Sequence, residues 1–125
     1  MKKVISTPNA PAAIGPYSQA VEAGNLIFLS GMLPIDPATG EMVQSDVALQ
    51  TEQIFKNITA VLEAAGCTLE HIVKTTVFLA DMSLFAPMNA VYARYFPGTC
   101  PARSAVAVKE LPKNSLIEIE VIVAK

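Results

Sequence analysis

The sequence predicts an α+β fold in which a mixed β-sheet carries two helices on one face. Short apolar segments and two longer helical segments follow one another in the order ββαβαββ. Both helical segments are long enough to join parallel strands, and a right-handed path at each would put both helices on the same side of the sheet. With 125 residues, 52% of them hydrophobic, we expect residues 1–125 to form one domain with a single core.

An antiparallel pair of strands opens the predicted sheet. Two apolar segments, Tyr17–Glu22 and Leu26–Gly31, flank the turn-prone pair Gly24 and Asn25, which predicts a hairpin. The proline-rich segment before them and the segment 33–40, which is dense in turn-forming residues, are expected to be loops.

Each predicted helix has a capping side chain and a stop signal. Ser45 or Asp46 caps the first helix, whose apolar residues recur at three, four and seven positions, and Gly66 ends it. Asp81 or Ser83 caps the second helix, and a Phe-Pro-Gly sequence ends it. We therefore expect the apolar side of the first helix to pack against the sheet.

Three further strands are predicted, at Ile72–Ala80, Ala102–Val108 and Leu116–Ala124. Because both helices cover the same face, the other face of the sheet is left bare, and it would form a larger apolar patch than soluble monomers expose. Oligomerisation would cover this face. The alternative is that loops or the N-terminal segment cover it.

Composition argues against several functions. The net charge is −2 and the nine Lys and Arg residues are scattered, so nucleic acid is a poor partner. No signal sequence or membrane-spanning apolar run occurs, which predicts a cytoplasmic protein without a membrane partner. Cys67 and Cys100 stand apart and are expected to be unpaired thiols. His71 is the single histidine, so a His-based triad or a zinc hydrolase is not expected, and no glycine-rich phosphate loop is present.

Arg103 and Glu118 are the residues that could carry a reaction. Arg103 lies between small residues, where its guanidinium can hold a planar carboxylate through two hydrogen bonds; alternatively, it is an edge-strand arginine paired with a surface acid. Glu118 is either functional or an ordinary glutamate on the solvent side of a strand. If the last two strands formed a hairpin, the two residues would lie roughly 16 Å apart. A shared site therefore needs strands that do not pair with each other, or residues from two subunits.

Four motifs occur in order along the chain: Gly15-Pro16-Tyr17-Ser18-Gln19-Ala20, Leu29-Ser30-Gly31, Pro101-Ala102-Arg103-Ser104 and Ile117-Glu118-Ile119. In these motifs the chain resembles the Rid family of reactive-intermediate deaminases, also known as the YjgF or L-PSP group. The resemblance covers nearly the whole chain. It implies a chorismate-mutase-like (YjgF-like) fold with a six-stranded sheet and the last strand inserted inside it, and a homotrimer with three clefts between subunits.

The resemblance also implies an enzyme that hydrolyses reactive enamines and imines. Its substrates would be 2-aminoacrylate, 2-iminopropanoate and 2-iminobutanoate, and its products 2-keto acids and ammonia. No cofactor or metal is implied, because a protonated imine is already a strong electrophile and needs a held carboxylate and a placed water. The expected partners are therefore small imino or keto acids and further copies of the chain.

Seven residues receive a role from the resemblance. It implies that the Arg103 guanidinium holds the substrate carboxylate and that Glu118 orients or activates the water. The backbone carbonyl of residue 105 would accept a hydrogen bond from the substrate nitrogen. The residues implied to line the cleft or bind the substrate are Tyr17, Ser30, Gly31, Asn89 and Ala105.

Position 105 departs from the family pattern, because many members with this activity have Cys where this chain has Ala105. A backbone carbonyl survives that change, while the pocket loses a polarizable side chain. Two other functions stay open. The older L-PSP name suggests an endoribonuclease or translation inhibitor, against which the acidic balance and the single histidine argue. A regulatory or chaperone-like protein that binds keto acids without turnover would use the same clefts.

Overall fold

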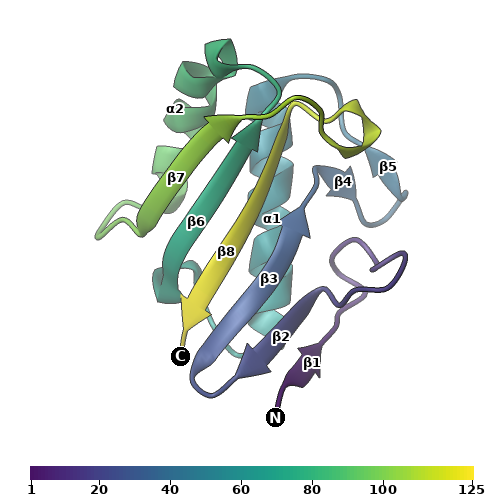
Figure 1. Cartoon of the computed structure of the whole chain (residues 1–125), viewed down its shortest axis with the longest axis vertical. Coiled ribbons are helices and arrows are strands. Elements are labelled where there is room, and N and C mark those ends of the chain that lie inside the picture. Colours follow the sequence, from purple (N-terminus) through teal and green to yellow (C-terminus); the bar gives the residue numbers. More distant parts are fainter.

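A six-stranded mixed sheet carries both helices on one face in the computed structural model, which describes all of residues 1–125 (Figure 1). The sheet strands are β1 (Lys3–Ile5), β2 (Ala20–Ala23), β3 (Leu26–Met32), β6 (Ile72–Leu79), β7 (Ala102–Ala107) and β8 (Ile117–Ala124). A separate hairpin consists of β4 (Ile35–Asp36) and β5 (Glu41–Met42). The helices are α1 (Val47–Ala64) and α2 (Phe85–Tyr95), with short 3₁₀ turns at Leu69–His71, Met82–Leu84 and Pro112–Asn114. The predicted α+β class is therefore confirmed.

The last strand lies inside the sheet, whose strand order is β1-β2-β3-β8-β6-β7. β8 runs antiparallel to both of its neighbours, β3 and β6, whereas β6 and β7 pair in parallel. β7 and β8 follow each other in the chain but do not pair. The hairpin geometry for Arg103 and Glu118 is therefore excluded, and the inserted last strand that the family resemblance implies is confirmed.

Both predicted helix starts have acidic caps. Asp46 caps α1, because its Oδ1 accepts a hydrogen bond from the Leu49 N–H at 3.0 Å. Asp81 accepts a hydrogen bond from the Ser83 N–H at 2.8 Å, but the element that it caps is the 3₁₀ turn before α2. The second helix therefore begins later than its cap predicts.

The N-terminal part of the sheet differs from the sequence-based prediction. β1, β4 and β5 were not predicted, and β4 lies in the segment 33–40 that was predicted to be a loop. β2 begins at Ala20 rather than Tyr17, because the buried Gln19 side chain is bonded to the N-terminal loop. Its Oε1 accepts a hydrogen bond from the Thr7 N–H at 2.7 Å, and its Nε2 donates one to the Pro11 carbonyl at 2.8 Å. These bonds hold the segment before Ala20 against the loop.

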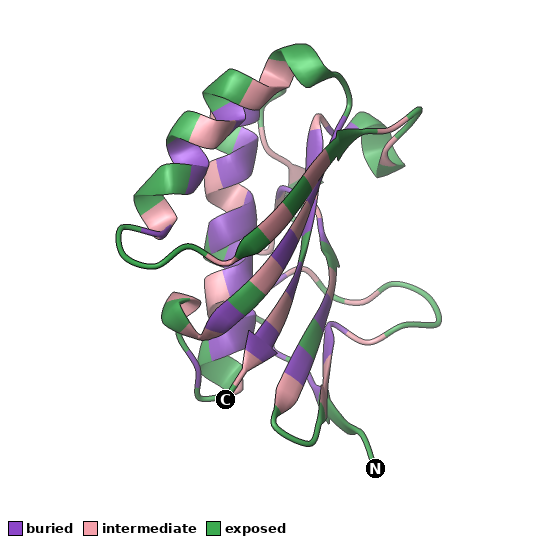
Figure 2. Ribbon diagram, turned by 60° about the vertical axis from the view of Figure 1, so that its left-hand side comes forward, coloured by how far each residue is buried: buried purple, intermediate pink, exposed green.

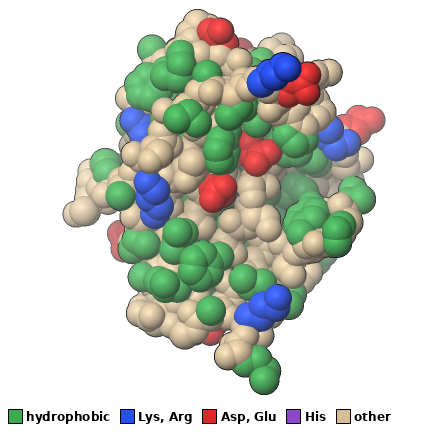
Figure 3. Space-filling model, in the orientation of Figure 1, with side chains coloured by type: hydrophobic (Ala, Val, Ile, Leu, Met, Phe, Trp, Pro, Cys, Tyr) green, Lys and Arg blue, Asp and Glu red, His purple; other side chains and the backbone are tan.

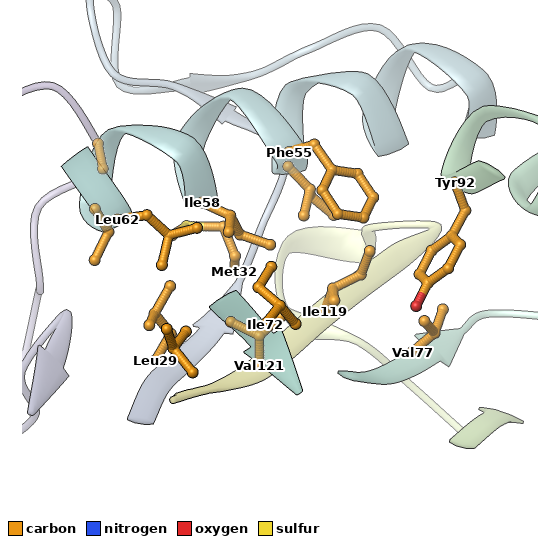
Figure 4. Close-up of a cluster of buried hydrophobic side chains, with 14 of the residues drawn as sticks. Leu29, Met32, Phe55, Ile58, Leu62, Ile72, Val77, Tyr92, Ile119 and Val121 are labelled. Atoms are coloured by element: carbon orange, nitrogen blue, oxygen red, sulfur yellow. The ribbon is translucent and has the colours of Figure 1, made fainter. Parts of the chain in front are cut away.

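The hydrophobic core fills the space between the sheet and the helices (Figures 2 and 4). The side of α1 that faces the sheet is buried, and Phe55 and Ile58 on it are at most 1% exposed. Alternate residues of β8 meet this helix, among them Ile119 and Val121 (Figure 4). Full burial of such a side chain contributes about 1.5–3 kcal/mol. This alternation fixes the face of the sheet on which every β8 side chain lies.

No segment of the chain crosses the other face of the sheet (Figure 1). Phe28 and Val106 on this face are 40% and 45% exposed, and Figure 3 shows hydrophobic groups spread over it. The N-terminal segment forms the edge strand β1 and leaves the face open, so this segment does not provide the predicted cover. Neither helix has both the length and the apolarity that a membrane crossing requires.

Candidate active site

The Arg103 side chain lies on the face of the sheet that carries the helices, where it contacts α2. Arg103 stands opposite Thr75 in the parallel β6–β7 pair, and the buried Thr75 side chain faces the helices. The Arg103 guanidinium lies on the same face, where its Nη1 donates a hydrogen bond to Asn89 Oδ1 at 2.7 Å. Its Cζ atom is 4.7 Å from the Tyr92 ring centroid and 5.3 Å from the Phe85 ring centroid. These three α2 residues share one face of the helix because they are spaced four and three residues apart.

Arg103 has no carboxylate partner. The ion pair of the structure joins Lys125 to Glu22 at 3.1 Å, at the other side of the sheet. A cavity of about 400 Å³ opens beside the guanidinium and is lined in part by Asn89 and Cys100. The alternative of an arginine paired with a surface acid is therefore wrong. Most of the five guanidinium N–H donors remain free to bind an anion.

Glu118 points to the open face of the sheet. Its neighbours Ile117 and Ile119 are fully buried on the helix side, and successive side chains of a strand point to opposite faces. Burial raises the pKa of the Glu118 carboxyl above its ordinary value, and repulsion from Glu120 raises it further. No cation and no hydrogen-bond donor offsets this shift. Glu118 is therefore a half-buried acid without a partner in its own chain.

Gly31 of β3 lies directly against the Glu118 carboxylate. A Cβ atom added at position 31 would collide with Glu118 Oε2 and would lie 2.9 Å from its Cδ. Beside it, the Ser30 hydroxyl donates a hydrogen bond to the Ser18 carbonyl at 2.6 Å. Tyr17, which is 52% exposed, lines a hollow of about 310 Å³ together with Ser30 and Gly31. The absence of a side chain at position 31 leaves the space that the carboxylate occupies.

The structure divides the predicted site residues into two groups. Arg103 and Asn89 lie on the helix face, and the partly buried Ala105 packs against the core from the same strand as Arg103. The second group lies at the open face and beside β3, and consists of Tyr17, Ser30, Gly31 and Glu118. The sheet separates the Arg103 guanidinium from the Glu118 carboxylate. A small molecule therefore cannot contact both of these groups within one chain.

Three residues around Arg103 were not among the predicted site residues: Thr75, Phe85 and Tyr92. The helical spacing of Phe85, Asn89 and Tyr92 is the signal in the sequence that could have grouped them, but pairing them with Arg103 requires the β6–β7 register. His, Cys, Asp and Glu side chains nowhere gather in groups of three that could hold a metal ion. The chemical groups at hand are a guanidinium, an amide, aromatic rings and a carboxylate.

The chain is similar to known proteins over nearly its whole length. A family model described as endoribonuclease L-PSP matches residues 7–125. A RutC family protein of Pyrococcus horikoshii is 58% identical over 125 residues, which are 100% of this chain and 99% of that protein. A mouse protein named 2-iminobutanoate/2-iminopropanoate deaminase is 49% identical over 122 residues, which are 98% of this chain and 90% of that protein.

The fold is also found in solved structures. A Yersinia pestis protein, described as a protein of unknown function in the conserved Rid protein family, superimposes with a TM-score of 0.98. It is 51% identical in sequence, and the match covers 100% of both chains. The strand insertion and the positions of both helices are therefore features that this chain shares with an experimentally determined structure.

Proposed function

The chain belongs to the endoribonuclease L-PSP (Rid) family, and from this premise we propose that it hydrolyses 2-iminopropanoate, 2-iminobutanoate and their enamine tautomers to 2-keto acids and ammonia. One observation carries the proposal: the Arg103 guanidinium is ordered by Asn89 and Tyr92, is unpaired with any acid, and borders a cavity. Such a group suits the carboxylate that all these substrates share. The name of the mouse relative supports the same reaction.

The reaction needs one water molecule and three proton transfers. Water adds to the carbon of the protonated C=N bond and gives up a proton, and the resulting carbinolamine is protonated on nitrogen. Its hydroxyl group then loses a proton as the C–N bond breaks, which releases ammonia and forms the C=O bond of the keto acid. Glu118 takes a proton from the attacking water and returns it to the leaving nitrogen. Its raised pKa suits this role, because a general base works best near the operating pH. The Ala105 carbonyl accepts a hydrogen bond from the substrate nitrogen.

The proposed site lies between copies of the chain, with Arg103 from one subunit and Glu118 from its neighbour in a homotrimer. The location of these two residues on opposite faces of the sheet supports this arrangement. So do the exposed apolar side chains of the open face, among them Phe28 and Val106, because apolar groups gathered on a protein surface often mark an interaction site. Tyr17, Ser30 and Gly31 then line the cleft on the Glu118 side.

A trapping assay tests the proposed activity. A pyridoxal-phosphate threonine or serine dehydratase generates the imine, semicarbazide competes for it, and the chain is added at increasing concentration. We expect the chain to release keto acid faster than semicarbazide traps the imine, and Arg103→Ala to lower kcat/KM by a factor on the order of 10³. Full activity in that variant would overturn the assignment. A wild type that binds pyruvate but never outcompetes the trap would instead support a keto-acid-binding protein.

A mixing experiment tests the shared site. Arg103→Ala and Glu118→Gln are each expected to be inactive as pure trimers. Trimers assembled from an equal mixture would regain about one quarter of the wild-type activity, because that fraction of sites combines an intact Arg103 with an intact Glu118. No recovery in verified mixed trimers would place both residues in the same subunit's site. Native mass spectrometry of each sample establishes the oligomeric state and the mixing.

A further inference from the structure

The Tyr92 ring lies between the hydrophobic core and Arg103. It is 5% exposed, and its centroid is 5.6 Å from that of Phe55 and 4.9 Å from that of Phe96. The Arg103 Cζ atom is 4.7 Å from the same ring. Figure 4 shows the ring extending from α2 toward the sheet, with its hydroxyl directed at the strand that carries Val77. The core therefore supports the ring that the guanidinium contacts.

The Tyr92 hydroxyl is fixed by a buried hydrogen bond. It lies 2.7 Å from Thr75 Oγ1, and Thr75 is completely buried. Thr75 is also the residue opposite Arg103 in the β6–β7 pair. The strand register and the Tyr92 side chain thus connect Thr75 with Arg103 by two independent routes. A buried pair of hydroxyl groups has no competing water, so breaking it leaves a polar group unsatisfied.

This arrangement limits the orientations of the guanidinium before any ligand binds. The Asn89 side-chain oxygen accepts a hydrogen bond from Arg103 Nη1, and the guanidinium stacks on the Tyr92 ring. The attraction between a cation and an aromatic ring is stronger when the cation is partly desolvated. A long side chain that is ordered in advance loses less freedom on binding a carboxylate. The affinity for the anion therefore depends on the placement of the ring.

We propose that Tyr92 and Thr75 are positioning residues, whose buried hydrogen bond holds the aromatic surface against which Arg103 is aligned for the substrate carboxylate. This inference rests on the proposed function, in which Arg103 binds that carboxylate. It predicts that losing either residue weakens binding of the imine and of 2-keto acids while the chemical step is nearly unchanged. In this role both residues act through Arg103, although the Tyr92 ring also lines the cavity beside the guanidinium.

Four variants test the proposal. Tyr92→Leu removes the ring, Thr75→Val removes the hydroxyl at nearly constant shape, and Thr75→Ser keeps the hydroxyl. Tyr95→Leu is the matched control, because Tyr95 lies on the same helix and stacks on Phe55 at 4.5 Å without contacting Arg103. The readouts are KM and kcat in the trapping assay, the Kd for pyruvate by NMR titration, and Tm.

We expect Tyr92→Leu to raise KM and the pyruvate Kd roughly tenfold, and Thr75→Val roughly threefold, with kcat changed less than about twofold. Thr75→Ser is expected to keep wild-type values, and Tyr95→Leu to lower Tm without changing KM. If Tyr92→Leu does not fold, the comparison of Thr75→Val with Thr75→Ser carries the test.

Two kinds of failure can be told apart. If the wild type turns over imine and binds pyruvate, but Thr75→Val and Tyr92→Leu match the Tyr95→Leu control in KM and Kd, the positioning role is overturned. Equal losses in Thr75→Val and Thr75→Ser would overturn it as well, because they would show a general packing effect. If the wild type neither turns over imine nor binds pyruvate, the proposed function fails, and this inference fails with it.

Discussion

The two charged residues of the site have opposite surroundings in the same chain. Arg103 is held by a hydrogen bond that its Nη1 donates to the Asn89 side-chain oxygen and by two aromatic rings of α2. Glu118 is half-buried on the other face, and neither a cation nor a hydrogen-bond donor stabilises its charge. The difference teaches that the surroundings of Arg103 are organised by its own chain, whereas Glu118 is a carboxylate held at a cost in stability. We expect mutations near Arg103 to change ligand binding, and mutation of Glu118 to change both activity and stability.

Glu118→Gln is expected to change activity most, and it tests whether the half-buried Glu118 carboxylate costs stability. Because Glu118 is the proposed general base, we expect its loss to lower kcat by a factor on the order of 10³. The same change removes a poorly solvated charge, so we expect Tm at neutral pH to rise by roughly 2–4 °C. Single-turnover kinetics and thermal denaturation measure the two effects. A variant that is both inactive and less stable would show that Glu118 is stabilising in the folded protein.

The pH dependence of this stability gain has a definite sign. Because the pKa of Glu118 is raised in the folded state, the folded protein binds the proton more tightly than the unfolded chain. The favourable contribution of Glu118 to the free energy of unfolding is complete below its ordinary pKa of 4.5. It is lost as the pH rises through the raised pKa of the folded protein. The Tm advantage of Glu118→Gln should therefore be negligible below this ordinary pKa and grow toward neutral pH. An advantage that shrinks with rising pH would contradict the burial argument.

Gly31→Ala tests the space around the carboxylate and is expected to have the next largest effect. The added methyl group would occupy the position of the Glu118 carboxylate, so we expect kcat to fall roughly 30-fold as that group is displaced. Gly98→Ala is the matched control, because a Cβ atom there would meet nothing within 4 Å and needs no unusual backbone angle. If both variants behave like the wild type in the trapping assay, the contact between Gly31 and Glu118 has no role in the reaction.

Asn89→Asp tests the contacts that organise Arg103. A carboxylate at position 89 would pair with Arg103 and compete with the substrate carboxylate, which we expect to raise KM roughly tenfold. Asn89→Ala removes the hydrogen bond without adding a charge and should raise KM only about threefold. Steady-state kinetics on both variants make the distinction. Equal KM values for the two would show that the charge on Arg103 does not determine binding.

Ala105→Cys is expected to have the smallest effect. Position 105 faces the core side of the edge strand β7 and is partly buried, so a thiol adds little volume and leaves the backbone carbonyl in place. We expect kcat/KM to stay within about twofold of the wild type for both imines. A larger change in the preference between 2-iminopropanoate and 2-iminobutanoate would show that this side chain contributes to substrate choice.

Local signals predicted most elements of this fold. The α1 helix begins at Val47 after the Asp46 cap, one of the two caps predicted for it, and β6 and β8 match their apolar segments within a residue. The alternation along β8 also places Glu118 opposite the buried face. The face on which Arg103 lies could not be predicted in this way, because it depends on the pairing of β7 with β6 and on α2. β1 was missed because its three residues are held by pairing with β2 rather than by an apolar pattern of their own.

The inserted position of β8 has a consequence for folding. The strands β1 to β3 and the pair β6–β7 form two half-sheets, and β8 alone joins them. Since β8 is synthesised after all the other strands, both half-sheets have unpaired edges until it arrives. Contacts between segments so distant in sequence slow folding, and exposed strand edges favour association with other chains. A growing chain of this protein therefore passes through a stage in which premature release or delay at the last strand favours aggregation.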